Sequence, residues 1–192
     1  MVHIAIIGTG SMANAIGGVF ADGGNSVEYI GKDADGSAQI SGDIVVLAVP
    51  YPAVESILDQ YAAQLVGKVV VDITNPLNFE TFDSLVVPAG SSAAAEIQAK
   101  LPQSRVVKAF NTTFAATLSS KTVGGVPTTV LIAGDDASAK QDLAAAIAAG
   151  GVSAIDAGSL ARAHELEALG FLQLTLAVAD RVAWTGGFAV VR

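Results

Sequence analysis

The sequence predicts an α/β fold in which a mostly parallel sheet carries helices on both faces. Short runs rich in Ile and Val alternate along the chain with segments whose apolar residues recur at helical spacing. The run from Asp43 to Val49 is almost entirely apolar, which is typical of a strand buried on both faces. Together these observations indicate a doubly wound, Rossmann-type architecture.

Apolar, β-branched runs predict the strands in order. They cover residues 4–7, 26–30, 43–49, 68–73, 106–110, 128–133 and 154–157, with a short terminal strand over 188–191. Only about a dozen residues separate the second strand from the third, too few for a crossover helix. A loop or a single turn is therefore expected there.

Helices are expected between most of these strands. The first follows Gly10, and apolar spacing predicts others over 54–65 and 91–101. The segment 135–138 supplies N-cap chemistry for a helix that ends near Ala149. The last strong helix is expected to carry four leucines on one face: Leu166, Leu169, Leu172 and Leu176.

The chain is long and apolar enough for one sizeable domain. It has 192 residues, of which 52% are hydrophobic and 15% are charged. These values exclude a disordered protein. A single domain is expected over residues 1–192, in which 159–192 form a C-terminal helix and tail that pack on the rest.

Charge and cysteine content exclude several classes of protein. The net charge of −8 disfavours nucleic acid or an anionic membrane as a partner, because both would be repelled. The absence of cysteine excludes disulfides and thiolate chemistry, and a cytoplasmic protein is expected. No basic signal-peptide stretch and no apolar run of roughly 18 residues is present, so no membrane insertion is expected.

A glycine-rich turn follows the first strand. Gly8, Gly10 and Ala13 fall at the spacing G-x-G-x-x-[GA]. In that motif the first glycine permits a sharp turn, the second lets the backbone approach a pyrophosphate, and the third small residue lets the helix pack on the strand. Unpaired amides and the helix dipole would then hold the diphosphate. The turn therefore predicts a dinucleotide-binding site.

The end of the second strand indicates which dinucleotide is bound. Gly31 leaves room for a 2′-phosphate and Lys32 offers it a cation, which favours NADP. Asp33 could instead accept hydrogen bonds from the ribose hydroxyls of NAD. Lys32 would in that case be an ordinary solvated lysine.

Several short motifs follow one another in an order that resembles a known family. They are Gly8-Thr9-Gly10, Ala48-Val49-Pro50, Asn75-Pro76, Ser92-Ala93-Ala94-Ala95-Glu96-Ile97, Lys108-Ala109-Phe110-Asn111-Thr112, Ala133-Gly134-Asp135-Asp136, Asp156-Ala157-Gly158-Ser159-Leu160 and Glu165-Leu166-Glu167. In this order and spacing the chain resembles, nearly end to end, the NADP oxidoreductases that work with the deazaflavin coenzyme F420. The nucleotide domain of that family is also similar to that of membrane-bound metalloreductases.

The resemblance implies a set of site residues. The stretch from Thr9 to Met12 would cover the pyrophosphate, and Gly31 with Lys32 would read the 2′-phosphate. Val49 and Pro50 would border the adenosine or nicotinamide side. The implied cofactor-binding set is Gly8, Thr9, Gly10, Ser11, Met12, Gly31, Lys32, Ala48, Val49, Pro50 and Asn75. Asn111 and Thr112 would lie in the pocket of the second substrate.

The expected chemistry needs no acid or base side chain. Hydride transfer between a nicotinamide and a flavin-like ring needs stacked rings and the exclusion of water. His3 is expected to be structural and His164 solvated or capping, so no catalytic residue is assigned. Asp135 and Asp136 are expected to cap a helix rather than hold a metal. Lys108 is expected to be solvated, with a phosphate or substrate contact as the alternative.

The sequence therefore predicts an NADP(H)-dependent oxidoreductase that passes hydride between the nicotinamide and a small deazaflavin- or flavin-like acceptor. Two alternatives stay open: a non-catalytic NADP(H)-sensing module, and the nucleotide-binding half of a multi-chain flavin or metal reductase. The apolar final helix and the tail over residues 184–188 are consistent with a homodimer and equally with ordinary packing onto the sheet, so both interpretations stay open.

Overall fold

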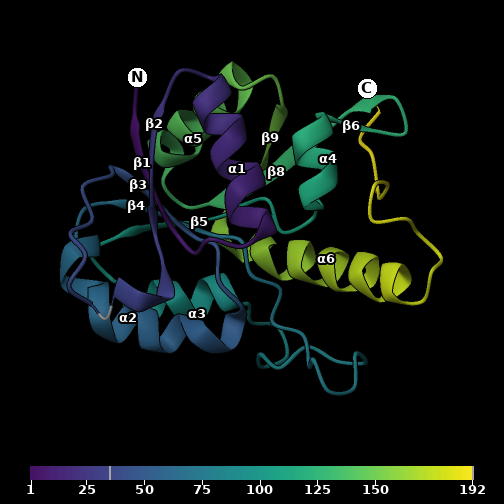
Figure 1. The fold of residues 1–192 in the computed structure, drawn as a ribbon. Helices are drawn as coiled ribbons and strands as arrows, with labels where there is room; N and C mark the ends of the chain where they lie inside the picture. The colour runs from purple at the N-terminus through teal and green to yellow at the C-terminus, as the bar shows by residue number, and fades with distance from the viewer. Residues whose placement is uncertain (35, 192) are drawn as a thin grey trace.

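The computed structural model describes residues 1–34 and 36–191, apart from the side chain of Asp33. Seven strands form one sheet in the order β2-β1-β3-β4-β5-β8-β9 (Figure 1). These strands are β1 (His3–Ile7), β2 (Ser26–Ile30), β3 (Ile44–Leu47), β4 (Val69–Asp72), β5 (Arg105–Lys108), β8 (Thr129–Gly134) and β9 (Ser153–Gly158). All neighbouring pairs are parallel except β5 with β8. The predicted doubly wound, mostly parallel sheet is confirmed.

The direction of winding reverses at β1. The chain passes from β1 through α1 (Ser11–Asp22) to β2, and then returns to place β3 on the other side of β1. Ile7 pairs with Ile30 on one side and with Leu47 on the other. The connections that leave β1 and β3 diverge here, which opens the crevice where doubly wound sheets bind ligands.

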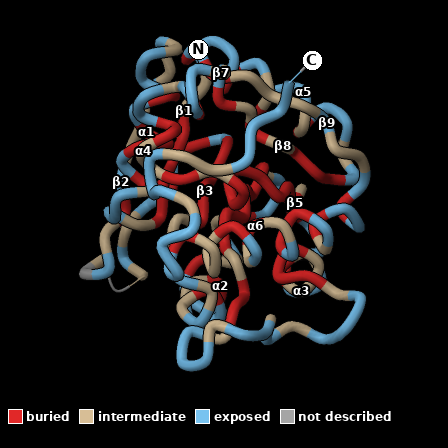
Figure 2. The backbone as a smooth tube through the Cα atoms, turned by 90° about the vertical axis from the view of Figure 1, so that its right-hand side faces the viewer, coloured by how far each residue is buried: buried red, intermediate tan, exposed pale blue. Residues whose placement is uncertain are grey.

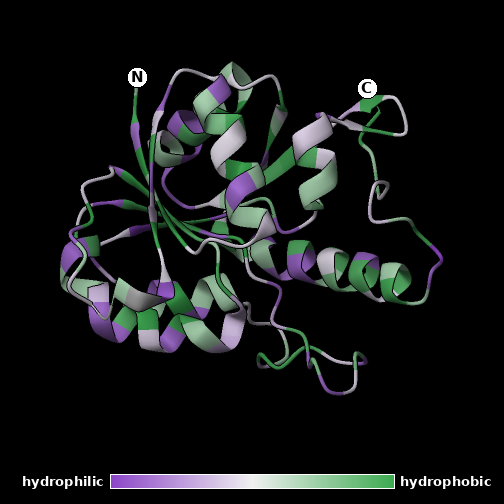
Figure 3. Cartoon of the chain, viewed as in Figure 1, coloured by the Kyte–Doolittle hydropathy of each residue, from purple (hydrophilic) through white to green (hydrophobic). Residues whose placement is uncertain are grey.

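Helices cover both faces of the sheet (Figures 1 and 3). One face is covered by α1, α4 (Ala115–Ser120) and α5 (Ala137–Ala149), around a core that includes Phe20 and Leu143. The other is covered by α2 (Tyr51–Leu65) and α3 (Ala93–Lys100), around a core that includes Leu58. Because both faces are covered, the strands between them are almost wholly apolar.

The connection between β2 and β3 contains a short turn instead of a helix. This turn is the 3-10 segment η1 (Lys32–Ala34), and it begins directly after Gly31. The prediction of a loop or a single turn is thereby confirmed. The second strand consequently ends in a turn at the crevice side of the sheet, and Lys32, the first residue of that turn, is exposed.

The final helix differs from its prediction. The 3-10 segment η2 (Leu160–Arg162) leads into α6 (Ala163–Val178), which points toward the viewer in front of the buried strands in Figure 2. The predicted leucine face is wrong, because Leu172 is 50% exposed. Of the four leucines only Leu166 is buried, and the rest of the buried face carries small and polar residues: Ala163, Glu167, Gly170, Gln173 and Ala177. The polar groups that α6 packs against determine which of its faces is buried. The homodimer stays a prediction.

Other segments also differ from expectation. Residues 188–191 form no strand. The helix α4 and the hairpin of β6 (Thr122–Val123) and β7 (Val126–Pro127) were not predicted. The fifth strand ends at Lys108, since the backbone of Phe110 has φ +63° and cannot continue an extended strand. Among the described residues, no helix has the length and apolarity that crossing a membrane requires.

Candidate functional site

The turn after β1 is built from backbone. Gly8 has φ +126°, and its amide donates to the Ile30 carbonyl at 2.8 Å. A Cβ on Gly8 would lie 2.2 Å from the Ala48 carbonyl oxygen, so the loop after β3 closes directly on this glycine. Only glycine fits this backbone conformation and this close approach.

The first turn of α1 opens onto the crevice. Gly10 is the N-cap residue and offers no side-chain cap, so the first amides of α1 lack a partner of that kind. A Cβ on Gly10 would meet nothing within 4 Å. Asn14 fixes the loop by donating to the carbonyls of Thr9 and Gly10, each at 3.1 Å. The result is a backbone cradle with open space in front of a helix N-terminus, a geometry suited to an anion.

The end of β2 lies beside this cradle. A Cβ on Gly31 would have Thr9 Cγ2 as its nearest neighbour, at 3.8 Å. Lys32 is exposed. The side chain of Asp33 lies outside the described part of the chain. Gly31, Thr9 and Lys32 therefore come together at the edge of the crevice, as the resemblance implies.

Two adjoining cavities follow the carboxyl ends of the strands. The glycine-side cavity, of about 360 Å³, is lined by the following residues: Gly10, Ser11, Met12, Ala13, Ala48, Val49, Pro50, Tyr51, Ile73, Thr74, Asn75 and Phe79. The aromatic cavity, of about 400 Å³, is lined by another set: Ser11, Met12, Ile73, Asn75, Phe110, Asn111, Thr113, Phe114, Ala115, Ala116, Leu174 and Trp184. Because Ser11, Met12, Ile73 and Asn75 line both cavities, the two cavities adjoin, and together they are called the cleft below.

Two asparagines meet where the cavities join. Asn75 Nδ2 donates to the Asn111 carbonyl and Asn111 Nδ2 donates to Asn75 Oδ1, both at 2.9 Å. Asn111 Nδ2 also donates to the Leu166 carbonyl of α6 at 2.7 Å. Asn111 Oδ1 is buried without a hydrogen-bond partner. A Cβ on Gly170 would lie 2.3 Å from Asn75 Oδ1, so α6 approaches this pair through its glycine.

Thr112 lies behind the cleft. It is 8% exposed and is absent from the residues that line either cavity, whereas its neighbour Thr113 lines the aromatic cavity. The Thr112 carbonyl accepts a hydrogen bond from Gln173 Nε2 at 3.2 Å. Of the two residues expected in the second-substrate pocket, the structure brings Asn111 to the cavity and gives Thr112 a supporting contact.

A buried ionic cluster lies beneath the asparagines. Lys108 is fully buried, and its Nζ lies 2.8 Å from Asp72 Oδ2 and 2.9 Å from Glu167 Oε1. The same ammonium donates to the Thr74 carbonyl. The expectation that Lys108 is solvated is wrong, because β4 and α6 each supply it with a carboxylate.

Glu167 ties α6 to α3 through the same cluster. Its carboxylate accepts the Ala93 amide at 2.9 Å and the Ala94 amide at 3.3 Å, at the N-terminus of α3. Burial raises the pKa of Glu167 above its ordinary value, against the opposing effect of Lys108. The cluster therefore joins β4, β5, α3 and α6 under the loop that carries Asn75.

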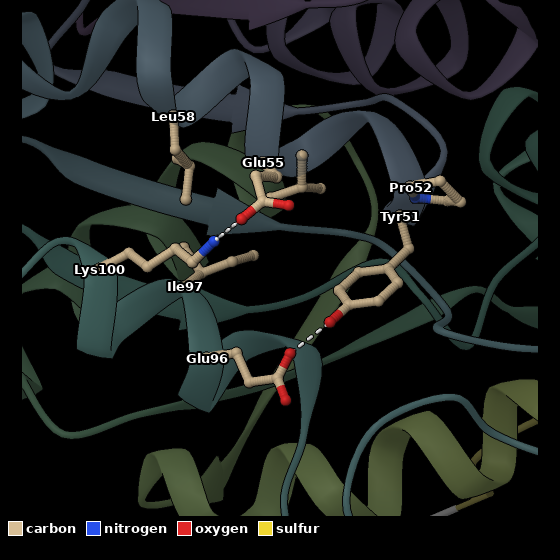
Figure 4. A pocket seen from close by; sticks show the side chains of 8 residues that line it. Tyr51, Pro52, Glu55, Leu58, Glu96, Ile97 and Lys100 are labelled. Carbon is tan, nitrogen blue, oxygen red and sulfur yellow. Dashed lines mark hydrogen bonds and ion pairs between the residues drawn. The ribbon is translucent and has the colours of Figure 1, made fainter.

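Tyr51 is the one ionisable side chain among the described residues lining the two cavities. Its hydroxyl donates to the carboxylate of Glu96 (Figure 4). Burial, then this hydrogen bond, raise the pKa of Tyr51 above its ordinary value. The pair closes one end of a separate cavity of about 260 Å³ between α2 and α3, and Lys100 with Glu55 closes the other. Tyr51 thus keeps its proton and points it away from the cleft.

The remaining polar candidates have structural partners. His3 is only partly buried and lies 3.4 Å from Ser41 Oγ, and His164 contacts the Ser91 carbonyl at 3.0 Å. Asp136 accepts the Ala139 amide at 2.7 Å, which is the expected helix cap. Asp135 accepts the Leu160 amide at 2.9 Å.

Sequence reasoning missed Tyr51, Phe114, Glu167, Gln173 and Trp184. For two of them a signal was available. Glu167 and Gln173 are polar residues inside the otherwise apolar pattern of a helix, and such residues point to a buried hydrogen-bonded group. Phe114 and Trp184 carry no local signal, since their meeting depends on the path of the tail.

Comparisons with known proteins agree on a family. The family described as "NADP oxidoreductase coenzyme F420-dependent" matches residues 28–76. The F420-dependent NADP reductase of Methanocaldococcus jannaschii is 34% identical over 169 residues, which cover 85% of this chain and 74% of that protein. The resemblance drawn from the motifs is confirmed.

Two further comparisons extend this result. A crystal structure from Arthrobacter sp. FB24, provisionally described as an F420-dependent NADP-reductase, matches with a TM-score of 0.86 and 26% identity over 100% of both chains. Metalloreductase STEAP3 of Rattus norvegicus is 34% identical over 130 residues, which cover 68% of this chain but 25% of that protein. The fold, the cleft at the strand ends and the relatives agree: the chain is an oxidoreductase that belongs to the family of F420-dependent NADP reductases.

Proposed function

We propose that this protein transfers hydride between the nicotinamide of NADP(H) and a deazaflavin ring, with no side chain acting as an acid or a base. The observation that carries the proposal is the pair of adjoining cavities, in which a backbone cradle lies on one side of Asn75 and a second, largely apolar cavity on the other. A dinucleotide and a planar acceptor need two adjoining sites of these two kinds. The deazaflavin is chosen because the Methanocaldococcus relative is named for coenzyme F420.

The nucleotide half of the cleft fits NADP(H). Gly10 leaves open the space in front of the α1 amides, where the diphosphate would be held. Gly31 leaves room beside Thr9, and the exposed Lys32 would pair with the 2′-phosphate. Ala48, Val49 and Pro50, which line the glycine-side cavity, would border the sugar and base groups.

When bound, the two rings would supply the redox chemistry: NADPH loses a hydride, the deazaflavin gains it together with a proton from solvent, and the reverse reaction releases that proton. The protein's part is to position the rings and exclude water. Asn75, which lines both cavities, and Asn111, which lines the aromatic cavity, would offer polar groups near the place where the cavities adjoin. Met12 and Ile73 line the same junction with apolar surface. Tyr51, whose proton is engaged by Glu96, is not a proton donor to the cleft.

Calorimetry with NADP, NADPH, NAD and NADH tests the nucleotide assignment. We expect NADP(H) to bind more tightly than NAD(H), and Lys32→Ala to weaken NADPH by roughly tenfold while leaving NADH unchanged. Lys100→Ala removes an exposed lysine paired with Glu55 and is the matched control, with no expected effect. Equal affinities for the phosphorylated and unphosphorylated forms would refute the NADP assignment and favour a ribose contact by Asp33.

Turnover then tests the acceptor. Purified protein mixed with NADPH and coenzyme F420 is expected to oxidise NADPH and reduce the deazaflavin in equal amounts. The protein could instead bind NADPH tightly and reduce neither the deazaflavin nor a free flavin. This result would refute the proposed acceptor and leave the proposed nucleotide unaffected.

A further inference from the structure

The C-terminal tail supplies one wall of the aromatic cavity. After α6 the chain turns back and runs to the side of α4 (Figure 1). On this path Trp184 meets Phe114, with ring centroids 4.9 Å apart and ring planes at 53°. Both rings line the cavity, and Trp184 keeps 50% of its surface exposed. A half-exposed indole at a cavity wall leaves an aromatic face for a ligand to cover.

A buried amide holds the tail in this place. Gln173 is 2% exposed, and both ends of its side chain are used. Its Nε2 donates to the Thr112 carbonyl at 3.2 Å, and its Oε1 accepts the Phe188 amide at 2.9 Å. Gly187, at φ +129°, passes so close that a Cβ there would lie 2.8 Å from Oε1.

The Gln173 contacts connect the wall of the cavity to its floor. Thr112 directly follows Asn111, which lines the aromatic cavity and exchanges a side-chain hydrogen bond with Asn75. The same buried amide therefore fixes the loop after β5 and the backbone of the tail. A group placed between the asparagines and the indole would meet polar contacts at one end and an aromatic face at the other.

We infer that Trp184 is a specificity-determining residue, which selects planar polycyclic acceptors by stacking, and that Gln173 is the positioning residue that holds it. The inference rests on the proposed function and adds to it the wall that recognises the acceptor ring. Aromatic stacking suits a flat ring system and gives little to a small carbonyl or imine substrate. The tail would thus determine specificity for the acceptor, and the glycine turn would determine specificity for the nucleotide.

Trp184 is the chain's single tryptophan, so its fluorescence reports on this wall alone. The wild-type protein, saturated with NADP, is titrated with coenzyme F420 and separately with FMN while tryptophan emission is followed. We expect saturable quenching by F420. A wild-type protein that binds NADPH but shows no quenching by either probe would overturn the inference.

Variants separate a stacking role from a structural one. The dissociation constant for F420, measured by equilibrium dialysis, is expected to rise about tenfold in Trp184→Leu and to recover largely in Trp184→Phe. Gln173→Ala is expected to give a similar rise with a red-shifted tryptophan emission. Gly187→Ala disturbs the same contact from the tail and is the second route if Gln173→Ala unfolds. NADPH affinity is expected to stay within about twofold throughout.

The outcomes distinguish this inference from the proposed function. Unchanged F420 affinity in Trp184→Leu, with normal NADPH binding, would overturn the role of the tail and leave the proposed function standing. A wild-type protein that binds no NADP(H) would refute the proposed function itself, and with it the inference.

Discussion

The two halves of the cleft are built in different ways. The half that the proposed function assigns to the nucleotide, called the nucleotide half, lies at the ends of β1, β2 and β3 and is a backbone cradle with glycines at fixed spacing. The half that it assigns to the acceptor, called the acceptor half, lies at the ends of β4 and β5 and is made of side chains brought together by α4, α6 and the tail. The first depends on local sequence, whereas the second depends on tertiary packing.

Their supports differ as well. Gly8 closes on Ala48 through backbone atoms. The acceptor half stands over Lys108, Asp72 and Glu167, which are all fully buried. Removing one member of such a cluster leaves another charge buried without its partner. The comparison therefore predicts that the two halves fail independently, through different kinds of substitution.

The largest expected effect is on the ionic cluster. Lys108→Met leaves Asp72 and Glu167 buried without their cation and is expected to lower the free energy of unfolding by about 3–5 kcal/mol. Acceptor binding should weaken more than NADPH binding in the folded fraction. Denaturant unfolding measures the change in the free energy of unfolding. Lys100→Met, which removes an exposed lysine paired with Glu55, is the control and is expected to be nearly neutral. A loss below about 1 kcal/mol would contradict the role given to the cluster.

Two variants, Gly8→Ala and Gly10→Ala, test how the glycines of the nucleotide half contribute to stability and to NADPH binding. Gly8→Ala combines φ +126° with a Cβ 2.2 Å from a carbonyl oxygen, and is expected to cost roughly 2–3 kcal/mol of stability along with nucleotide binding. Gly10→Ala has free space around its Cβ, so stability is expected to change by less than about 0.5 kcal/mol. Its methyl group would occupy the cradle and weaken NADPH by at least about tenfold. Equal NADPH affinity in Gly10→Ala and in the wild-type protein would contradict nucleotide binding at the backbone cradle.

The free energy of unfolding should depend on pH through Glu167, which lies in the buried cluster of the acceptor half. Because burial raises the pKa of Glu167, the folded protein binds this proton more tightly than the unfolded chain does. The free energy of unfolding should therefore fall as pH rises above the ordinary value of 4.5, by up to about 1.4 kcal/mol per pH unit until the folded-state pKa is passed. Glu167→Gln is expected to remove this slope. Parallel slopes in the two proteins would assign the dependence to other groups.

The smallest expected effect is that of pH on the chemical step. The raised pKa keeps Tyr51 protonated, and no other ionisable side chain of the described residues lines the two cavities. Single-turnover hydride transfer should thus change by less than about threefold between about pH 6 and 9, in wild type and in Tyr51→Phe alike. A bell-shaped profile would show that an acid or base has been overlooked.

The parts that sequence predicts well are those set by neighbours along the chain. Gly8, Gly10 and Ala13 act within one strand–turn–helix unit, and the run from Asp43 to Val49 needs only its own apolarity to indicate a buried strand. The short turn after β2 followed from the small number of residues available. In each case the pattern that supports the prediction lies within the segment itself, although Gly8 also contacts Ala48 of the loop after β3.

The parts that sequence does not predict depend on distant partners. Gln173 donates to a carbonyl 61 positions away, and Asn111 to one 55 positions away. Lys108 looks like a solvated strand-end lysine until α6 brings a carboxylate to it. The leucines of α6 suggested the wrong face, because its packing is governed by Gly170 and by buried polar groups.

The three-residue turn η1 has a consequence for how this protein changes over evolutionary time. It replaces a crossover helix, and Lys32, at its start, is exposed. On the proposed function, the choice between NADP and NAD is then encoded in surface positions that the hydrophobic core does not constrain. One or two substitutions at Gly31 and Lys32 would then change the coenzyme preference without disturbing the buried charges of the acceptor half.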